Sequence, residues 1–281
     1  MSAEYNATEH VQDSSVLELP FGTEIHLPSF DIPVPDCLQS VLGTSIHFGT
    51  KYMWLEVVAF LLCCLIFIPL ARKIRTGEPV KGRFANLMEA MVLFVRDNIA
   101  IPNMGKEHSK TYLPFLLTTF FFILFCNLLG LVPWLGSATG AWATTIILAI
   151  STFIVVNFAG MKQKGIIKYW VGLCPHMDIH WTLKIVLVPM LWLLEFISLL
   201  IKHFVLSVRL LANMFAGHLV LAVILGFIFM TAGSAIWYGV MPASVLGCVC
   251  LNLLELFVAF LQAYIFTFLS ALFIGSAMKG H

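Results

Sequence analysis

Two long apolar stretches of this sequence contain six ionisable side chains. The stretches run over residues 183–230 and 241–277, and the six residues are Glu195, Lys202, His203, Arg209, His218 and Glu255. An ionisable side chain at the centre of a lipid bilayer costs at least about 2.5–3.5 kcal/mol on insertion scales. A set of six therefore indicates a function carried out within the membrane.

The spacing of these residues predicts a polar helical face. Glu195, Lys202 and Arg209 are seven residues apart, so successive members drift by only about 20° around a helix. Asn213 extends this face. His218 follows Arg209 by nine positions, which is about 180° around the helix, so it looks into a different environment.

The residue types suggest proton conduction interrupted by a fixed charge. An arginine keeps its proton at accessible pH, so Arg209 suits a permanent positive barrier or counter-ion. Histidine titrates near neutrality and a buried carboxylic acid can do the same, so His218 and Glu255 can relay protons between water and the middle of the membrane. Glu255 and Gln262 are again seven apart, and an antiparallel hairpin of the two stretches would bring them toward the first polar face.

A purely structural interpretation of single residues stays open. In it, Lys202 and His203 mark a membrane interface by extending their polar ends to water, and Glu195 pairs with Lys202. The remaining ionisable groups are then structural hydrogen-bonding partners. This interpretation does not account for the whole set of six.

The composition assigns the chain to the membrane. Of its 281 residues 60% are hydrophobic and 11% are charged, against roughly half and a quarter in soluble proteins, which excludes a water-soluble enzyme. The first fifty residues contain seven acids and no Lys or Arg, which argues against nucleic-acid binding. The seven cysteines are scattered and imply no disulfide framework.

The sequence predicts an all-α integral membrane protein with five crossings. Its expected parts are an N-terminal segment (1–50), a first transmembrane helix (51–75), an interfacial amphipathic helix (81–98), two transmembrane helices (112–164) and a helical hairpin (180–277). The two hairpin helices exceed the roughly 20 residues that a vertical span needs, so they must be strongly tilted. The first segment is either an ordered cap or a disordered tail.

The distribution of positive charge predicts the orientation. Eight Lys or Arg lie within residues 72–110, four within 162–184 and one at Lys279, whereas the opposite loops carry only Lys51. The positive-inside rule then makes the N-terminus extracytoplasmic and the C-terminus cytoplasmic. The N-terminus resembles neither a secretory signal nor a transit peptide, so a bacterial inner membrane is expected.

Three sequence blocks resemble subunit a of the F-type ATP synthase. One block reads Arg209-Leu-Leu-Ala-Asn213-Met-Phe-Ala-Gly217-His218-Leu and is preceded by Glu195. Another reads Leu261-Gln262-Ala-Tyr264-Ile-Phe, and an earlier span contains Asn127-Leu-Leu-Gly130-Leu-Val-Pro133. The resemblance covers residues 50–277 and leaves only the acidic N-terminal stretch unaccounted for.

The resemblance implies a stator subunit that faces a rotating ring of c subunits. Subunit b of the peripheral stalk, the remainder of the ATP synthase and membrane lipid are the further partners, and no cofactor, metal, nucleotide or nucleic acid is expected on this chain. Arg209 would be the essential arginine that separates two aqueous half-channels. The residues at matching proton-pathway or polar-face positions are Glu195, Asn213, His218, Glu255 and Gln262, with Lys202, His203 and Tyr264 as minor candidates.

Two departures from the family pattern affect the lining of one half-channel. The chain has Lys202-His203-Phe-Val205 where the family often has Lys-Pro or Arg-Pro followed by a small hydroxyl residue. The third span begins Gly140-Ala-Trp142-Ala-Thr144-Thr145, without the Asn often found there. His203 is either an added titrating group or a peripheral, aromatic-like substitution.

One alternative is a divalent-metal site in a cytoplasmic loop. Cys174, His176, Asp178 and His180 alternate along that loop and offer four ligand types. Alternation in a loop does not by itself establish a tetrahedral geometry, so solvated polar residues are the simpler interpretation.

Two further alternatives use the same buried charges. Glu195 and Glu255 would form the general acid/base pair of an intramembrane hydrolase, although no nucleophile elbow or HExxH helix supports it. A stand-alone proton or cation carrier would need a counter-carboxylate for Arg209 in the same chain, and Glu195 lies about 21 Å away along the helix. The sequence leaves sodium open as the coupling ion.

Overall fold

The membrane part of the protein is helical. The computed structural model describes residues 16–19, 23–26, 30–33, 45–48, 50–75, 82–132, 137–172 and 181–279. Among them, five helical regions are long and apolar enough to cross a membrane: Lys51–Arg72, Arg83–Gly130, Trp142–Lys164, Leu187–Met230 and Trp237–Met278. The predicted all-α membrane architecture with five crossings is confirmed.

The two last helices are the longest elements. The helices are α2 (Lys51–Arg75), α3 (Arg83–Phe94), the π-helical η2 (Val95–Ala100), α4 (Ile101–Gly130), the 3-10 helix η3 (Ala138–Gly140), α5 (Trp142–Lys164), α6 (Ile166–Val171), α7 (Trp181–Met230) and α8 (Trp237–Lys279). With 50 and 43 residues, α7 and α8 are about 75 and 65 Å long. A hydrocarbon core of about 30 Å is too thin to contain either helix upright.

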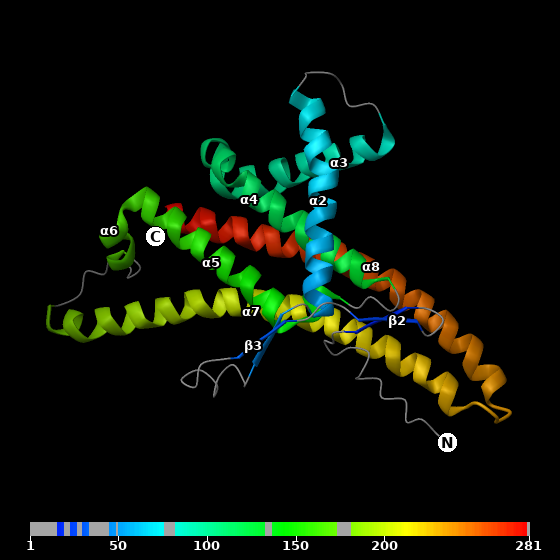
Figure 1. The fold of residues 1–281 in the computed structure, drawn as a ribbon. Helices are drawn as coiled ribbons and strands as arrows, with labels where there is room; N and C mark the ends of the chain where they lie inside the picture. The colour runs from blue at the N-terminus through cyan, green and yellow to red at the C-terminus, as the bar shows by residue number, and fades with distance from the viewer. Residues whose placement is uncertain are drawn as a thin grey trace. The chain divides into compact units, whose positions relative to one another are not determined.

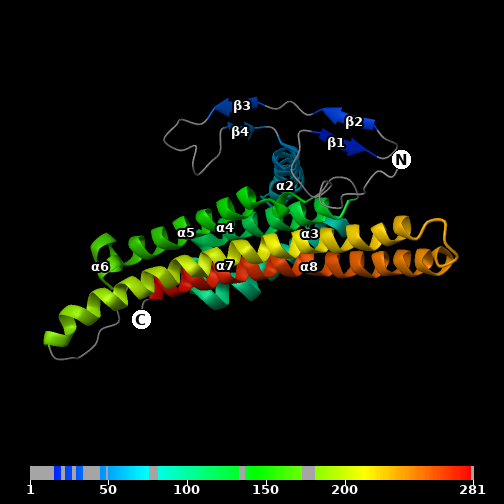
Figure 2. The same ribbon diagram turned by 90° about the horizontal axis from the view of Figure 1, so that it is seen from below.

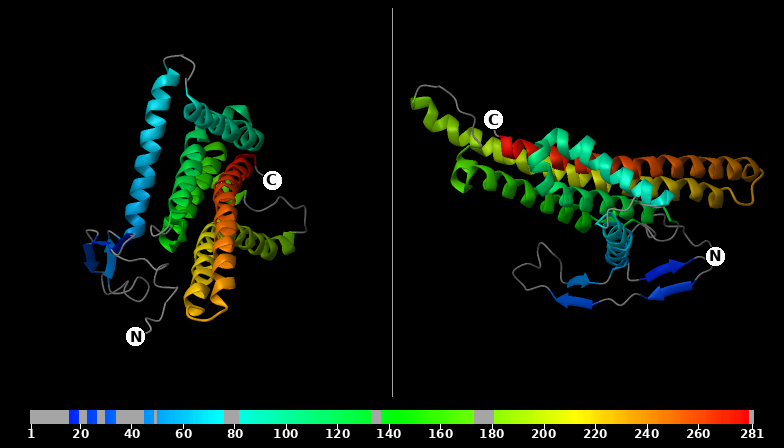
Figure 3. Two further views of the ribbon diagram at one scale, coloured as in Figure 1. Left: turned by 90° about the vertical axis from the view of Figure 1, so that its right-hand side faces the viewer. Right: turned by 90° about the horizontal axis from the view of Figure 1, so that it is seen from above.

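Four short strands precede the first helix. Strand β1 (Val16–Leu19) pairs antiparallel with β2 (Thr23–His26), and β3 (Phe30–Pro33) pairs antiparallel with β4 (Ser45–Phe48). The two pairs are separate two-stranded sheets (Figure 3). These described parts of the N-terminal segment are therefore ordered strands, which the sequence left undecided.

The chain forms two compact units. The first unit comprises residues 1–69, 122–142 and 211–262, and the second comprises residues 70–121, 143–210 and 263–281. In the first unit, the end of α7 and the beginning of α8 form an antiparallel hairpin closed by a short turn (Figure 1). This hairpin carries the polar residues His218 and Glu255.

A hydrophobic cluster stabilises the first unit. It joins Tyr52, Leu55 and Ala59 of α2 to Cys126 of α4 and Ala138 of η3. All five are at most 5% exposed, so the first half of α2 packs against the end of α4 and the loop that follows it.

In the second unit, α5 runs alongside the first part of α7 (Figure 2). The buried side of α5 contains small side chains at helical spacing, including Thr145, Ala149, Thr152 and Ala159. Small residues allow helix backbones to approach closely, which is how helices associate in lipid without a hydrophobic driving force.

The short helix α6 folds back onto α5 within the second unit. The turn between them is made at Gly165, whose φ of 87° favours glycine. The Tyr169 hydroxyl then donates to Asn157 Oδ1 over 3.2 Å. A Cβ at Gly160 would overlap the Tyr169 ring, so the glycine is needed for this packing.

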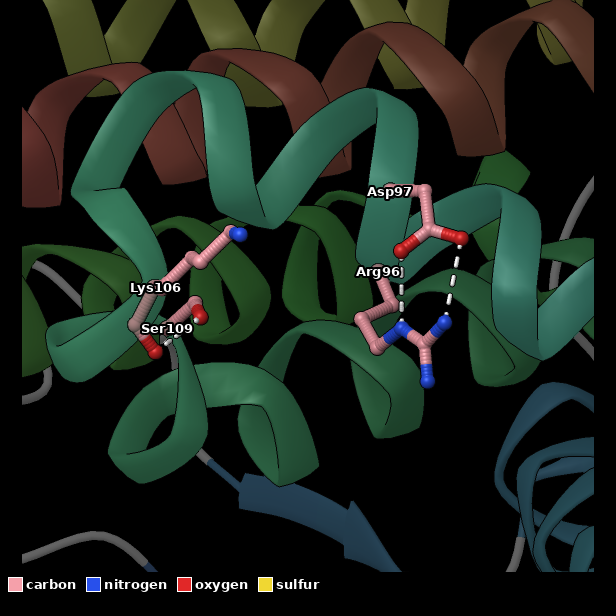
Figure 4. A network of polar contacts seen from close by, with 4 residues as sticks. All are labelled: Arg96, Asp97, Lys106 and Ser109. Atoms are coloured by element: carbon pink, nitrogen blue, oxygen red, sulfur yellow. Dashed lines mark hydrogen bonds and ion pairs between the residues drawn. The ribbon is translucent and has the colours of Figure 1, made fainter.

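A π-helical turn and a kink interrupt the path from α3 into α4. In η2, the Arg96 guanidinium contacts both carboxylate oxygens of Asp97 at 2.8 and 3.1 Å (Figure 4). The kink follows at Gly105, which has a φ of 78°, and the Ser109 hydroxyl donates to the Lys106 carbonyl at 3.1 Å beyond it. The break lets α4 run in a different direction from α3. Glycine can adopt this positive φ at little steric cost because it has no Cβ.

Candidate functional site

One continuous helix carries most of the predicted site. Helix α7 is continuous, and its only proline is Pro189. The regular helical backbone therefore sets the relative positions of its polar residues. It carries Glu195, Lys202, His203, Arg209, Asn213 and His218, and α8 carries Glu255, Gln262 and Tyr264.

The structure brings His218 and Glu255 together inside the first unit. His218 Nδ1 lies 4.0 Å from Glu255 Oε1, and the two side chains are 20% and 6% exposed. This distance exceeds a hydrogen bond. Among the described residues, His218 Nε2 and Glu255 Oε1 have no hydrogen-bond partner. A small movement or one water molecule is enough to connect the imidazole and the carboxyl group.

Gly217 makes room for Glu255 beside α7. A Cβ built on Gly217 would lie 2.8 Å from Glu255 Oε1 and 3.1 Å from its carboxyl carbon. Both distances are too short for a side chain to fit without displacement of the carboxyl group. The glycine therefore allows the α8 carboxyl group to approach the α7 backbone.

Arg209 has no counter-ion within the part of the chain that the structure describes. It is half-buried in the second unit, and no described residue forms an ion pair or a hydrogen bond with it. A guanidinium is always charged, and an unpaired buried charge is costly. An acceptor from outside these residues would satisfy it.

The two remaining polar-face residues lie in the first unit. Asn213 is half-buried on α7, and Gln262 is 5% exposed on α8. Both can donate and accept hydrogen bonds without titrating.

Glu195 and Lys202 form an ion pair in the second unit. Glu195 Oε1 lies 3.9 Å from Lys202 Nζ, across the seven-residue spacing read from the sequence, and the side chains are 38% and 47% exposed. In this chain, Glu195 has its own cationic neighbour.

His203 and Tyr264 belong to aromatic clusters of the second unit. His203 is 4% exposed, with ring centroids 5.2 Å from Phe153 and 5.2 Å from Phe273. Tyr264 packs against Phe94 at 5.8 Å and stacks on Phe268 at 6.0 Å. The His203 ring is thus buried and packs against two phenylalanine rings.

A buried polar network explains the block that begins at Asn127. Asn127 Nδ2 donates to the Ala259 carbonyl of α8 at 3.3 Å, and Thr139 Oγ1 donates to Asn127 Oδ1 at 2.6 Å. Ser137 and Thr139 share a further 2.8 Å hydrogen bond. The sequence pointed to the block that begins at Asn127 but not to Ser137 and Thr139, because these two residues belong to no periodic pattern.

The structure leaves the proposed metal ligands undescribed. Cys174, His176, Asp178 and His180 lie outside the described residues. Within the described ranges, no three His, Cys, Asp or Glu side chains are grouped so as to hold a metal ion.

Comparison with known proteins yields one consistent family. The family model described as ATP synthase A chain matches residues 52–275. "ATP synthase subunit a" of Myxococcus xanthus is 40% identical over 289 residues, covering 94% of this chain and 90% of the relative. "ATP synthase subunit a 2" of Prosthecochloris aestuarii is 42% identical over 278 residues, covering 97% and 79%. "ATP synthase subunit a" of Chloroherpeton thalassium is 40% identical over 276 residues, covering 97% and 76%.

Proposed function

The chain belongs to the ATP synthase subunit a family, the proton-translocating membrane subunit of that complex, and on this premise we propose how its residues move protons. Two aqueous half-channels end near α7, and Arg209 separates them at the interface with a rotating ring of c subunits. A proton enters one half-channel, neutralises a ring carboxylate, travels with the ring and leaves through the other half-channel.

The observation that carries this proposal is the buried pair of His218 and Glu255. Their nitrogen and oxygen lie 4.0 Å apart within the α7–α8 hairpin. An imidazole and a carboxyl group can each accept and release a proton, and their burial among helices separates them from bulk water. The pair therefore passes a proton from one half-channel toward the ring.

Arg209 acts as the barrier and as the electrostatic partner of the ring. Its lack of a counter-ion among the described residues supports an anion supplied by another subunit. A guanidinium favours the ionised form of a nearby carboxyl group, so a ring carboxyl group that reaches Arg209 releases its proton. Because arginine cannot relay protons, the two half-channels stay separate.

The other candidate residues have supporting roles. Asn213 and Gln262 provide neutral hydrogen-bonding groups on the polar face, and Glu195 with Lys202 lines the opposite half-channel. His203 and Tyr264 are secondary participants. The coupling ion in this proposal is a proton. The choice between a proton and sodium is made by the carboxylate site of the ring.

The chain acts only as part of the complex. The c-ring and subunit b of the peripheral stalk are its direct partners, and nucleotide chemistry takes place on other subunits. The N-terminal segment (1–50) lies outside the cytoplasm, the helix 81–98 lies at the interface, and the hairpin 180–277 faces the ring. We place the chain as a multi-pass protein in a bacterial inner membrane, and the charge distribution supports a cytoplasmic C-terminus.

The test is Arg209→Ala in vesicles that contain the assembled complex. We expect gradient-driven ATP synthesis to fall by about 100-fold or more, the usual effect of removing a preorganised charge. After the soluble head has been removed, passive proton leak should be higher in the Arg209→Ala complex than in the wild type. The matched control is Arg96→Ala, which removes an exposed arginine already paired with Asp97 and should leave synthesis unchanged.

Normal ATP synthesis in the Arg209→Ala complex, with normal assembly, would contradict the rotary mechanism. Persistent proton transport by the isolated chain would then favour the stand-alone carrier.

A further inference from the structure

Two buried polar atoms on α7 lack partners at a place to which the proposed mechanism assigns no defined step. His203 and Ser207 are one helical turn apart and are 4% and 1% exposed. Among the described residues, neither His203 Nε2 nor Ser207 Oγ has a hydrogen-bond partner. Both belong to the second unit, as do all the residues around them discussed below.

The hydrogen bond on the other side of the ring fixes the role of the unpaired nitrogen. His203 Nδ1 lies 2.8 Å from the Leu199 carbonyl oxygen, which can only accept, so Nδ1 carries the hydrogen. In the neutral ring Nε2 is then a free acceptor. Ser207 Oγ can both donate and accept.

The ring cannot turn away from this position. It packs edge-on against Phe153 of α5 at 5.2 Å and 88°, and it lies 5.2 Å from Phe273 of α8. These aromatic contacts offer no hydrogen-bonding atom to Nε2. Buried polar atoms in native proteins are nearly always satisfied, and where protein groups are absent an ordered water takes their place.

We propose that His203 Nε2 and Ser207 Oγ hold a buried water molecule that conducts protons. Side chains four residues apart on a helix have Cβ atoms about 5–6 Å apart, a separation that a water with two hydrogen bonds can bridge. A proton that arrives at the water oxygen is matched by another of the water's own protons, which leaves to a neighbouring water of the half-channel, while His203 Nε2 and Ser207 Oγ hold the water in place. Each O–H bond formed is thus balanced by one broken, and the water is regenerated.

This inference rests on the proposed function and adds a hydrated station to it. The station lies in the second unit, whereas the His218–Glu255 pair lies in the first. It also gives His203 a role that a proline or a purely aromatic residue cannot fill, because neither offers a nitrogen lone pair.

The experiment measures passive proton conduction by head-depleted vesicles carrying the assembled complex. His203→Phe keeps a ring between the two phenylalanines but removes Nε2, and Ser207→Ala removes Oγ. We expect each variant to conduct about tenfold more slowly, the effect of about 1.4 kcal/mol. His203→Gln, which restores a hydrogen-bonding group without a titrating ring, should retain most of the conduction.

The matched control is Ser270→Ala in the same unit. The Ser270 hydroxyl is buried like that of Ser207 but already donates to the Phe266 carbonyl at 2.8 Å. Its removal should leave conduction unchanged. In a high-resolution density map of the wild-type complex, an ordered water should lie within hydrogen-bonding distance of both His203 Nε2 and Ser207 Oγ.

Wild-type conduction in His203→Phe and Ser207→Ala, equal losses in His203→Gln and His203→Phe, or a map without this water would each overturn the inference. If any of these results is found and the Arg209→Ala complex is separately shown to be inactive, the inference fails but the proposed function stands. An active Arg209→Ala complex would instead count against the proposed function itself.

Discussion

Gly217 matters because it determines where the carboxyl group of Glu255 can lie. A helix interior disfavours glycine by roughly 0.5–1 kcal/mol relative to alanine, so a glycine directly before His218 needs a compensating packing role. The 2.8 Å distance from its missing Cβ to Glu255 Oε1 supplies that role. One hydrogen atom in place of a methyl group thus sets the geometry of the His218–Glu255 pair.

At the residue scale, we expect Gly217→Ala to impair proton transport. Overpacking a tight contact costs about 1–3 kcal/mol, and relief would come from displacement of Glu255 away from His218. Gradient-driven ATP synthesis should fall by about tenfold. The measurement is the ATP synthesis rate in vesicles containing the assembled complex.

The control for this substitution is Gly247→Ala on α8 in the same unit, because a Cβ there meets nothing within 4 Å. Full activity of Gly247→Ala beside reduced activity of Gly217→Ala would assign the effect to Glu255. Equal rates in both variants would refute the packing argument.

At the scale of elements, the hydrogen bonds of Asn127 connect three segments of the first unit. They link α4 to the loop at η3 through Thr139 and to α8 through the Ala259 carbonyl. Both Asn127 and Thr139 are fully buried. A satisfied buried network of this kind specifies one packing arrangement, whereas a partly satisfied one is costly.

We therefore expect Asn127→Leu to destabilise the membrane sector. The substitution keeps a similar volume but leaves buried polar atoms unpaired, each at a cost of about 1–3 kcal/mol. The temperature at which the purified membrane sector aggregates should fall by several degrees. Asn252→Leu, at an exposed position of α8, is the control, and an equal effect in the two variants would rule out a role for the network.

The docking of α6 on α5 should depend on pH. Burial raises the pKa of Tyr169 above its usual value of 10.0, because the charged phenolate is poorly solvated there. The protonated hydroxyl also donates to Asn157. This contribution to stability is present below pH 10 and is lost as the pH rises through the higher pKa of the folded state.

An absorbance titration of tyrosinate tests this expectation on the purified protein. Tyr169→Phe should remove one group that ionises later than the usual tyrosine range. Tyr238→Phe, which replaces a tyrosine that is 78% exposed, is the control for the loss of one tyrosine. If Tyr169→Phe and the wild type show the same high-pH component in their titration curves, Tyr169 is not the group that ionises late.

At the scale of the whole molecule, five crossings place the two ends of the chain on opposite sides of the membrane. In a cysteine-free background, Ser2→Cys should react with a membrane-impermeant maleimide in intact cells. His281→Cys should react only in inverted vesicles. The opposite pattern would reverse the orientation, and labelling of both sites from one side would contradict five crossings.

The sequence by itself determined the membrane class, the number of crossings and the residues worth testing. Apolar runs and their length report directly on the cost of moving backbone and side chains into lipid. The seven-residue spacing of Glu195 and Lys202 likewise predicted a shared face, because position on a helix is a local property. The ion pair between them follows from that spacing.

Only the tertiary structure decided which groups meet across helices. The 4.0 Å approach of His218 to Glu255, the space provided by Gly217 and the hydrogen bonds of Asn127 all join residues on different segments. The burial of Ser207 depends in the same way on the helices around it. Contacts of this kind depend on how helices pack, and no periodicity within one helix contains that information.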